Sequence, residues 1–95
     1  MQIQNKYVGK KGMFYVENEG IVQAKMVYHM RSPDNMVIEH TEVDDVLRGK
    51  NVGVELVTAA VEYARAHNIK ITAWCPFAKK VFGKRPDFQD VLAVT

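Results

Sequence analysis

This 95-residue sequence is short of cysteine, of long apolar runs and of excess charge, and each absence excludes a class of protein. Cys75 is the only cysteine, so no disulfide can form within the chain, and we expect a reducing, cytoplasmic setting. No apolar run approaches the ~20 residues of a membrane span, and the start MQIQNKYVGK lacks the apolar core of a signal peptide. The net charge of +2 does not indicate the basic stripe of a nucleic-acid binder, although it suits an anionic small ligand. We therefore expect a soluble, intracellular protein that spans no membrane.

What is present is enough apolar sequence for one core. The hydrophobic fraction is 47%, and a chain of 95 residues makes one domain and not two. No repeat, linker or low-complexity tract divides it. We predict a single domain over residues 1–95.

The first half of the chain has the period of two that is typical of strands. Residues 12–17 are aromatic and β-branched, and a hairpin turn follows at 18–20. Apolar and polar residues alternate over 21–30, which predicts a half-buried strand. Turn residues then lead to a third strand over 36–43. The prediction is an antiparallel meander that starts at about Gly12.

The second half changes to a helical period. Residues 52–67 predict an amphipathic helix with Asn68 as a left-handed cap. Residues 69–74 predict a buried strand, 77–82 a short helix, and 88–94 either a last strand or a packed tail. A strand–helix–strand step is a right-handed crossover between parallel strands. We therefore predict an α+β fold with a mixed sheet. The apolar face of the long helix consists of Leu56, Val57, Ala60, Val61 and Ala64.

The turn RGKNVG, residues 48–53, stands directly before the long helix. A helix N-terminus offers unsatisfied N–H groups and a partial positive charge, and glycines let a ligand come close. The turn therefore predicts an anion site, above all for phosphate, with Arg48 and Lys50 adding charge. The mononucleotide P-loop does not fit, because Val54 and Glu55 follow Gly53 where that motif needs lysine and serine or threonine. The dinucleotide fingerprint does not fit either, because it needs three glycines and only Gly49 and Gly53 are present.

A third loop fits this turn. It resembles the motif [QR]-x-x-G-x-[GA] of the GNAT superfamily of N-acetyltransferases, whose backbone N–H groups hold the pyrophosphate of coenzyme A. Arg48 and Gly53 match, and Asn51 stands where glycine is usual; asparagine tolerates left-handed dihedral angles better than most residues. The whole chain resembles small single-domain GNAT-like proteins, often called YjdJ-type acetyltransferases. HTEV at 40–43, the stretch LRGKNVG to YAR at 47–65, CPF at 75–77 and PDF at 86–88 carry this resemblance.

The resemblance implies a GNAT fold with acetyl-coenzyme A as co-substrate. In such folds two adjacent parallel strands, here 36–43 and 69–74, splay apart around the pantetheine arm. Lys79 and Lys80 either form a solvated face or contact a 3′-phosphate at the nucleotide end. The implied cofactor-binding residues are Val43, Arg48, Gly49, Lys50, Asn51, Val52, Gly53, Val54, Cys75 and Pro76.

The resemblance also implies two catalytic candidates, Cys75 and His40. Larger GNAT enzymes often use a tyrosine as acid on the helix after the splayed strand, but residues 77–82 contain none. Cys75 is the substitute, either as proton donor or as a nucleophile that forms an acetyl-cysteine, and His40 is the natural base. Each also has a plain structural interpretation, Cys75 as a small buried residue and His40 as a hydrogen-bonded sheet residue. His29, His40 and Cys75 show no metal-ligand spacing, so no metal is expected.

The predicted function is the transfer of acetyl from acetyl-coenzyme A to a primary amine. The first predicted strand starts so early that little wall precedes it, and such an open acceptor site favours an amine of a protein or peptide. Two alternatives stay open. One is a coenzyme A-binding module without turnover, acting as a sensor or carrier. The other is a small interaction protein that uses its sheet edge.

Overall fold

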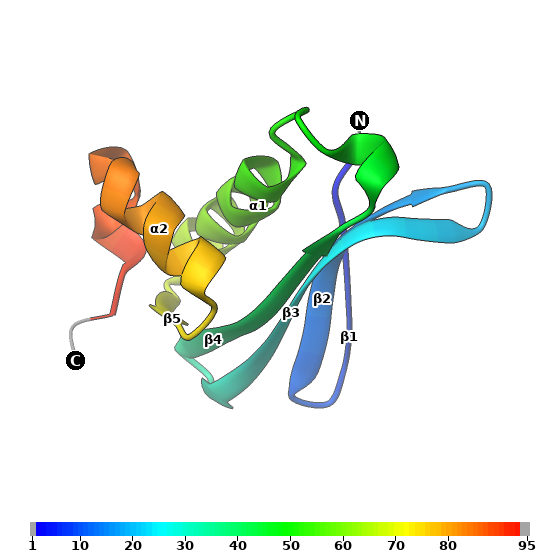
Figure 1. Ribbon diagram of the computed structural model, residues 1–95. Helices are drawn as coiled ribbons and strands as arrows, with labels where there is room; N and C mark the ends of the chain where they lie inside the picture. Colours follow the sequence, from blue (N-terminus) through cyan, green and yellow to red (C-terminus); the bar gives the residue numbers. More distant parts are fainter. Residues whose placement is uncertain (1, 94–95) are drawn as a thin grey trace.

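The fold is a five-stranded sheet with helices packed on one face, as a computed structural model describes it for residues 2–93 (Figure 1). Short 3-10 helices, labelled η, precede the long helix and end the described chain. The elements in chain order are β1 (Gln4–Val8), β2 (Lys11–Asn18), β3 (Ile21–Ser32), β4 (Asn35–Val43), η1 (Asp45–Leu47), α1 (Val52–His67), β5 (Lys70–Ala73), α2 (Pro76–Lys84) and η2 (Pro86–Val91).

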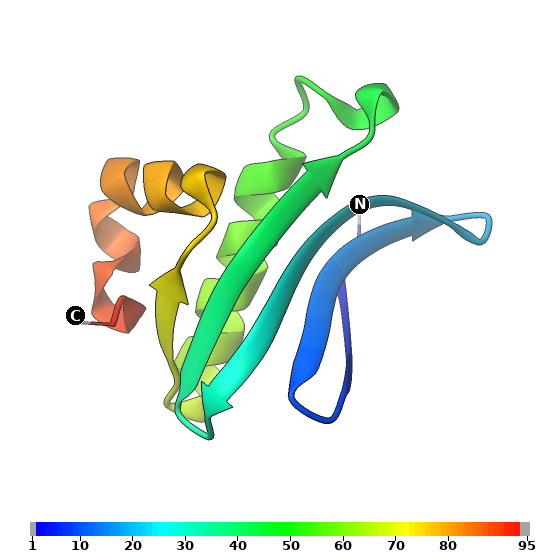
Figure 2. The same ribbon diagram turned by 60° about the horizontal axis from the view of Figure 1, so that its bottom comes forward.

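The strands lie in their chain order, β1-β2-β3-β4-β5. The first three pairings are antiparallel and the last, β4 with β5, is parallel. Helix α1 makes the crossover between β4 and β5 and lies along one face of the sheet, with α2 and η2 beside it (Figures 1 and 2). The prediction of a mixed sheet with an antiparallel first part and one long crossover helix is confirmed.

The core lies between α1 and the sheet. The predicted apolar face of α1 is buried along its whole length, together with Val52 and Gly53 at the helix start. On the sheet side Met26, Met36 and Ile38 are fully buried. Each large aliphatic side chain removed from water stabilises the fold by about 1.5–3 kcal/mol.

The prediction was wrong at the start of the chain, where it missed β1. This edge strand pairs only with β2, from Gln4 opposite Tyr15 to Val8 opposite Lys11. It carries little apolar signal because its outer residues lie in water; Val8 is 89% exposed. Its polar side chains are nevertheless engaged, since the Tyr28 hydroxyl donates a hydrogen bond to the Asn5 side chain at 2.8 Å.

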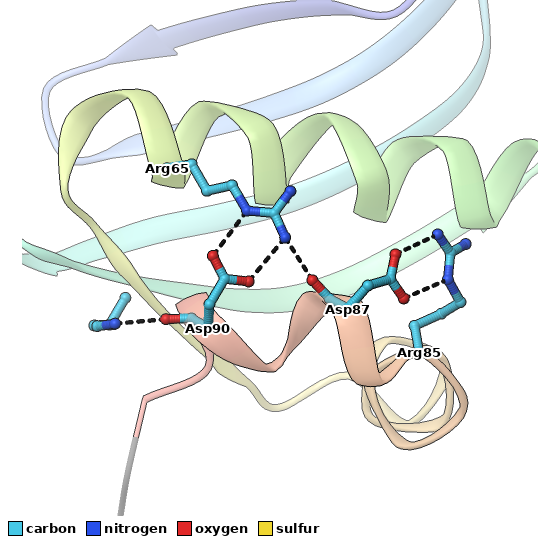
Figure 3. A network of polar contacts seen from close by, with 5 residues as sticks. Arg65, Arg85, Asp87 and Asp90 are labelled. Carbon is cyan, nitrogen blue, oxygen red and sulfur yellow. Dashed lines mark hydrogen bonds and ion pairs between the residues drawn. The ribbon is translucent and has the colours of Figure 1, made fainter.

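At the other end, the segment predicted as a strand or packed tail is the 3-10 helix η2. A single parallel bridge follows, between Ile71 and Leu92; Val94, the last residue of the predicted segment, lies outside the described residues. An exposed ion pair holds η2 against α1 (Figure 3). Arg65 of α1 donates to both carboxylate oxygens of Asp90 at 2.8 Å, and Lys70 donates to the Asp90 carbonyl.

Candidate active site

The sheet opens between β4 and β5, as the resemblance implied. The two strands pair only from Asn35 opposite Lys70 to Ile38 opposite Ala73. The N–H groups of Trp74 and Cys75 then both donate to the Ile38 carbonyl, at 2.9 and 3.2 Å. Beyond that point β4 continues to Val43, whereas the segment after β5 turns away from the sheet into α2 (Figure 2). A gap between two parallel strands results.

A β-bulge in β4 decides which side chains face α1 at this gap. Val27 of β3 lies opposite His40, but the next residue of β3 lies opposite Ile38, so Glu39 is an extra residue. Because side chains alternate along a strand, one extra residue reverses the faces of all that follow. Thr41 therefore points to the α1 face, like its partner Met26, and His40 points to the opposite face.

A cavity of about 380 Å³ lies on the α1 face beside this gap. It is bounded by the last residues of β4, by the turn before α1 and by the first residues of α1. Seven of the ten predicted cofactor-binding residues line it: Val43, Arg48, Gly49, Asn51, Val52, Gly53 and Val54. Lys50, Cys75 and Pro76 are not among its lining residues, whereas Thr41, Leu47 and Phe77 are and were not predicted.

The turn before α1 has the backbone shape that its sequence implied. Gly49 has a φ of 80° and Asn51 a φ of 62°, both left-handed. Asn51 therefore adopts the conformation that favours glycine, as its tolerance of left-handed angles predicted. The first helical hydrogen bond is donated by the N–H of Glu55 to the Asn51 carbonyl at 3.1 Å. The N–H groups of Arg48 and Lys50 donate to the carbonyls of Asp45 and Leu47. Those of residues 52–54 belong to the open end of the helix, where an anion is stabilised.

Gly53 is needed for packing. Its φ is not left-handed, but a Cβ added there would lie 2.6 Å from the tip of the Phe77 ring. Phe77, 38% exposed, thus lies directly against the backbone of the first turn of α1. The glycine lets α2 approach α1 at the wall of the cavity.

Positive charge gathers around the helix start. Arg48 is exposed, and its Nε lies 3.0 Å from the Asp45 carboxylate. A second cavity of about 400 Å³ adjoins the first and shares Asn51, Val54 and Phe77 with it. Its basic residues are Lys80, Lys84 and Arg85; the predicted Lys79 is not among its lining residues.

The two predicted catalytic residues lie on opposite faces of the sheet. Cys75 is 5% exposed, and its thiol lies 3.4 Å from the Thr41 hydroxyl, which lines the cavity. His40 is largely exposed on the other face, with Nε2 at 3.4 Å from a Glu42 carboxylate oxygen. A hydrogen bond from Lys25 and, to a lesser degree, His40 hold the pKa of Glu42 below its ordinary value. The structure therefore does not bring the thiol and this imidazole together.

Residues 2–93 contain neither a metal-binding cluster nor a membrane-spanning helix. No cluster of three or more His, Cys, Asp or Glu side chains in that range is arranged to hold a metal ion. None of the described helices combines the length and apolar character needed to cross a membrane.

Comparison with known proteins supplies the family. A family model described as GCN5-related N-acetyl-transferase matches residues 13–91. Among solved structures, a GCN5-like protein of Staphylococcus aureus is 35% identical over 97% of this chain and 89% of its own, with a TM-score of 0.72. None of the curated protein sequences compared with this chain matches it.

More distant structures share the fold alone. The ribosomal-protein-alanine N-acetyltransferase of Brucella melitensis is 14% identical, covers 90% of this chain and 64% of its own, and has a TM-score of 0.62. An aminoglycoside N-acetyltransferase in complex with coenzyme A is 13% identical, with 81% of this chain and 67% of its own covered and a TM-score of 0.59.

The mixed sheet, the gap between its parallel strands and the cavity at the helix start define a domain of the N-acetyltransferase class. With the family match over most of its length, the chain belongs to the GCN5-related N-acetyltransferase family. The narrower YjdJ-type resemblance stays a prediction.

Proposed function

We propose that this domain binds acetyl-coenzyme A in the cavity between β4 and α1 and transfers the acetyl group to a primary amine. The observation that carries the proposal is the gathering of seven predicted residues around one cavity, at the point where the parallel strands separate. The solved aminoglycoside N-acetyltransferase of the same fold, which contains coenzyme A, supports it.

The residues present fit such a co-substrate. The N–H groups from Val52 to Val54 and the Arg48 guanidinium offer charge-assisted hydrogen bonds to a pyrophosphate. Thr41 and Val43 line the side of the cavity that leads to the gap. In the adjoining cavity, Lys80, Lys84 and Arg85 provide the positive charge for a further phosphate.

Acetyl transfer from a thioester to an amine requires a proton donor near the departing sulfur and a proton acceptor near the amine. Cys75 is the proposed donor, because its thiol lies beside Thr41 at the cavity. It is alternatively the nucleophile; its thiolate would then take the acetyl group, coenzyme A would leave as a thiol, and the amine would displace Cys75. The sequence predicts His40 as the proton acceptor; it lies on the other face of the sheet, which also carries His29.

Binding without turnover is a second candidate, and the burial of Cys75 favours it. A thiol that is 5% exposed needs a local movement before it can react, and the helix that follows it has no tyrosine to replace it. If turnover occurs, an amine of a protein or peptide is favoured, because no helix of residues 2–93 covers the sheet face opposite α1 (Figure 2). The cytoplasmic setting inferred from the single cysteine stays a prediction.

The test is a titration of isotope-labelled protein with coenzyme A and acetyl-coenzyme A, followed by amide NMR. We expect the largest shifts from Arg48 to Val54. Shifts confined to β1 and β2 would overturn the proposed site. Release of coenzyme A thiol in the presence of a lysine peptide then separates transfer from binding alone, and a complete lack of coenzyme A binding would favour a small interaction protein instead.

A further inference from the structure

The acceptor amine has one route to the gap between β4 and β5. The cavity, the turn before α1 and the Cys75 thiol all belong to the α1 side of the sheet. A co-substrate in that cavity closes the gap from this side. The opposite face of the sheet is turned toward the viewer in Figure 2, and no helix of residues 2–93 covers it. An acceptor must therefore approach from that face.

Trp74 stands at the gap on that approach. It follows β5 directly, and its N–H is fixed by the Ile38 carbonyl at 2.9 Å. It is 53% exposed, although tryptophan is usually well buried. The His29 ring lies edge-on to the indole, with 5.4 Å between ring centroids. The sheet thus presents a large aromatic surface beside the gap.

His29 is held there by a carboxylate. Its Nδ1 forms a hydrogen bond with a carboxylate oxygen of Glu39, the bulge residue that marks the gap. About a quarter of each of the two side chains is exposed. A carboxylate on Nδ1 fixes the tautomer that leaves Nε2 as an acceptor, and an imidazole oriented in this way is the arrangement of a general base.

The neighbouring histidine is less well fixed. His40 is 58% exposed, and its nearest carboxylate, Glu42, also pairs with Lys25 at 3.4 Å. Two other cations stand near His29 on this face: Lys11 lies directly opposite it on β2, and Arg31 is engaged with Asn35. When His29 is neutral, its pair with Glu39 carries one negative charge beside an exposed indole.

Resting on the proposed function, we propose that His29, Glu39 and Trp74 receive the acceptor as a protonated primary amine, and that His29 takes its first proton. An ammonium group is attracted both by an indole face and by a carboxylate. The ammonium gives one proton to Nε2 of His29, and the imidazolium formed is stabilised by Glu39. The freed nitrogen bonds to the thioester carbonyl carbon, the carbon–sulfur bond breaks, and the second surplus proton of the nitrogen ends on the departing thiolate. His29 then returns its proton to water.

The experiment uses the full chain, acetyl-coenzyme A and a peptide with a blocked N-terminus and one lysine. His29→Gln should lower kcat by roughly 10²-fold or more, the range of general base catalysis, with coenzyme A affinity unchanged. Trp74→Ala should raise the KM for the peptide about 10-fold, as expected for a lost cation–π contact, and Trp74→Phe should restore most of it. The control His67→Gln, at the far end of α1, should match the wild type.

A second acceptor distinguishes catalysis from structural support. The terminal nitrogen of an acyl hydrazide is unprotonated at neutral pH, so its acetylation should depend much less on His29. Equal losses with hydrazide and lysine peptide would overturn the assignment of His29. A normal rate in His29→Gln combined with a loss in His40→Ala would overturn it too, while leaving the proposed function intact.

Binding alone gives an independent test if no turnover is seen. Trp74 is the single tryptophan, so its fluorescence and its indole N–H signal report on this surface. With coenzyme A bound, the lysine peptide should perturb both signals, and a peptide with norleucine in place of lysine should not. Equal responses to the two peptides, or none to either, would overturn the inference, whereas unshifted amides from Arg48 to Val54 on adding coenzyme A would overturn the proposed function itself.

Discussion

The contact between Gly53 and Phe77 leads to a prediction about protein stability. Gly53→Ala should lower the free energy of unfolding when the Phe77 ring is present and raise it when the ring is removed. In Gly53→Ala the new Cβ lies 2.6 Å from the ring tip and 2.8 Å from the next ring carbon, closer than packed side chains allow. Overpacking costs about 1–3 kcal/mol, with the lower end expected here because a partly exposed ring can move. Alanine in a helix is favoured over glycine by up to ~1 kcal/mol, less at a helix start. We expect a net destabilisation of about 1 kcal/mol.

Removing the ring should reverse this result. In Phe77→Ala the space above residue 53 is open, so Gly53→Ala should then stabilise the protein by several tenths of a kcal/mol through helix propensity alone. Urea unfolding of the wild type, both single variants and the double variant, followed by Trp74 fluorescence, gives the coupling free energy. A Gly53→Ala protein that is more stable than the wild type, or an effect that is the same in both backgrounds, would refute the packing role of Gly53.

Three further predictions concern the site and the C-terminal segment. Arg48→Ala should weaken coenzyme A binding by ~1–3 kcal/mol, measured by calorimetry. If neither this substitution nor added salt changes the affinity, Arg48 is only a solvated charge. If Cys75 is a nucleophile, acetyl-coenzyme A should leave a thioester visible by mass spectrometry and absent in Cys75→Ser; if it is an acid, no label forms but Cys75→Ala slows transfer. Hydrogen bonds from Arg65 hold the pKa of Asp90 below its ordinary value. The stability from this pair is therefore complete above the ordinary pKa and is lost as pH falls through the lowered one. The difference in unfolding free energy between the wild type and Asp90→Asn should therefore become smaller in acid. A difference that does not change with pH would contradict the stabilising role of the Arg65–Asp90 pair.

The sequence predicted those parts of the fold that local periodicity controls. The alternation over residues 21–30 predicted the antiparallel meander. The apolar face of α1 predicted the crossover helix and its side of the core. The turn at 48–53 predicted most of the residues that line the cavity, because a helix start with left-handed residues is a local feature of the sequence. Strand β1 was missed because an exposed edge strand has no apolar alternation to detect.

The features that the sequence did not reveal come from contacts between distant segments. The bulge at Glu39 exists only in the pairing of β4 with β3, and it places Thr41 instead of His40 on the cavity side. In the same way, the contact of Phe77 with Gly53 depends on how α2 packs against α1. The pair of His29 with Glu39 joins two strands whose register the sequence alone does not fix.

The short pairing of β5 has a consequence for the motions of the domain. This strand is joined to the sheet over Lys70 to Ala73 on one side and by a single bridge to Leu92 on the other, and one exposed ion pair, Arg65 with Asp90, holds η2 against α1. Strands β2 and β3, by contrast, pair along most of their length. Native-state hydrogen exchange should therefore find two cooperative units, with β5, α2 and η2 opening at a lower free energy than the meander. The gap between β4 and β5 lies along the boundary between them, so it can widen and close while the rest of the sheet stays folded.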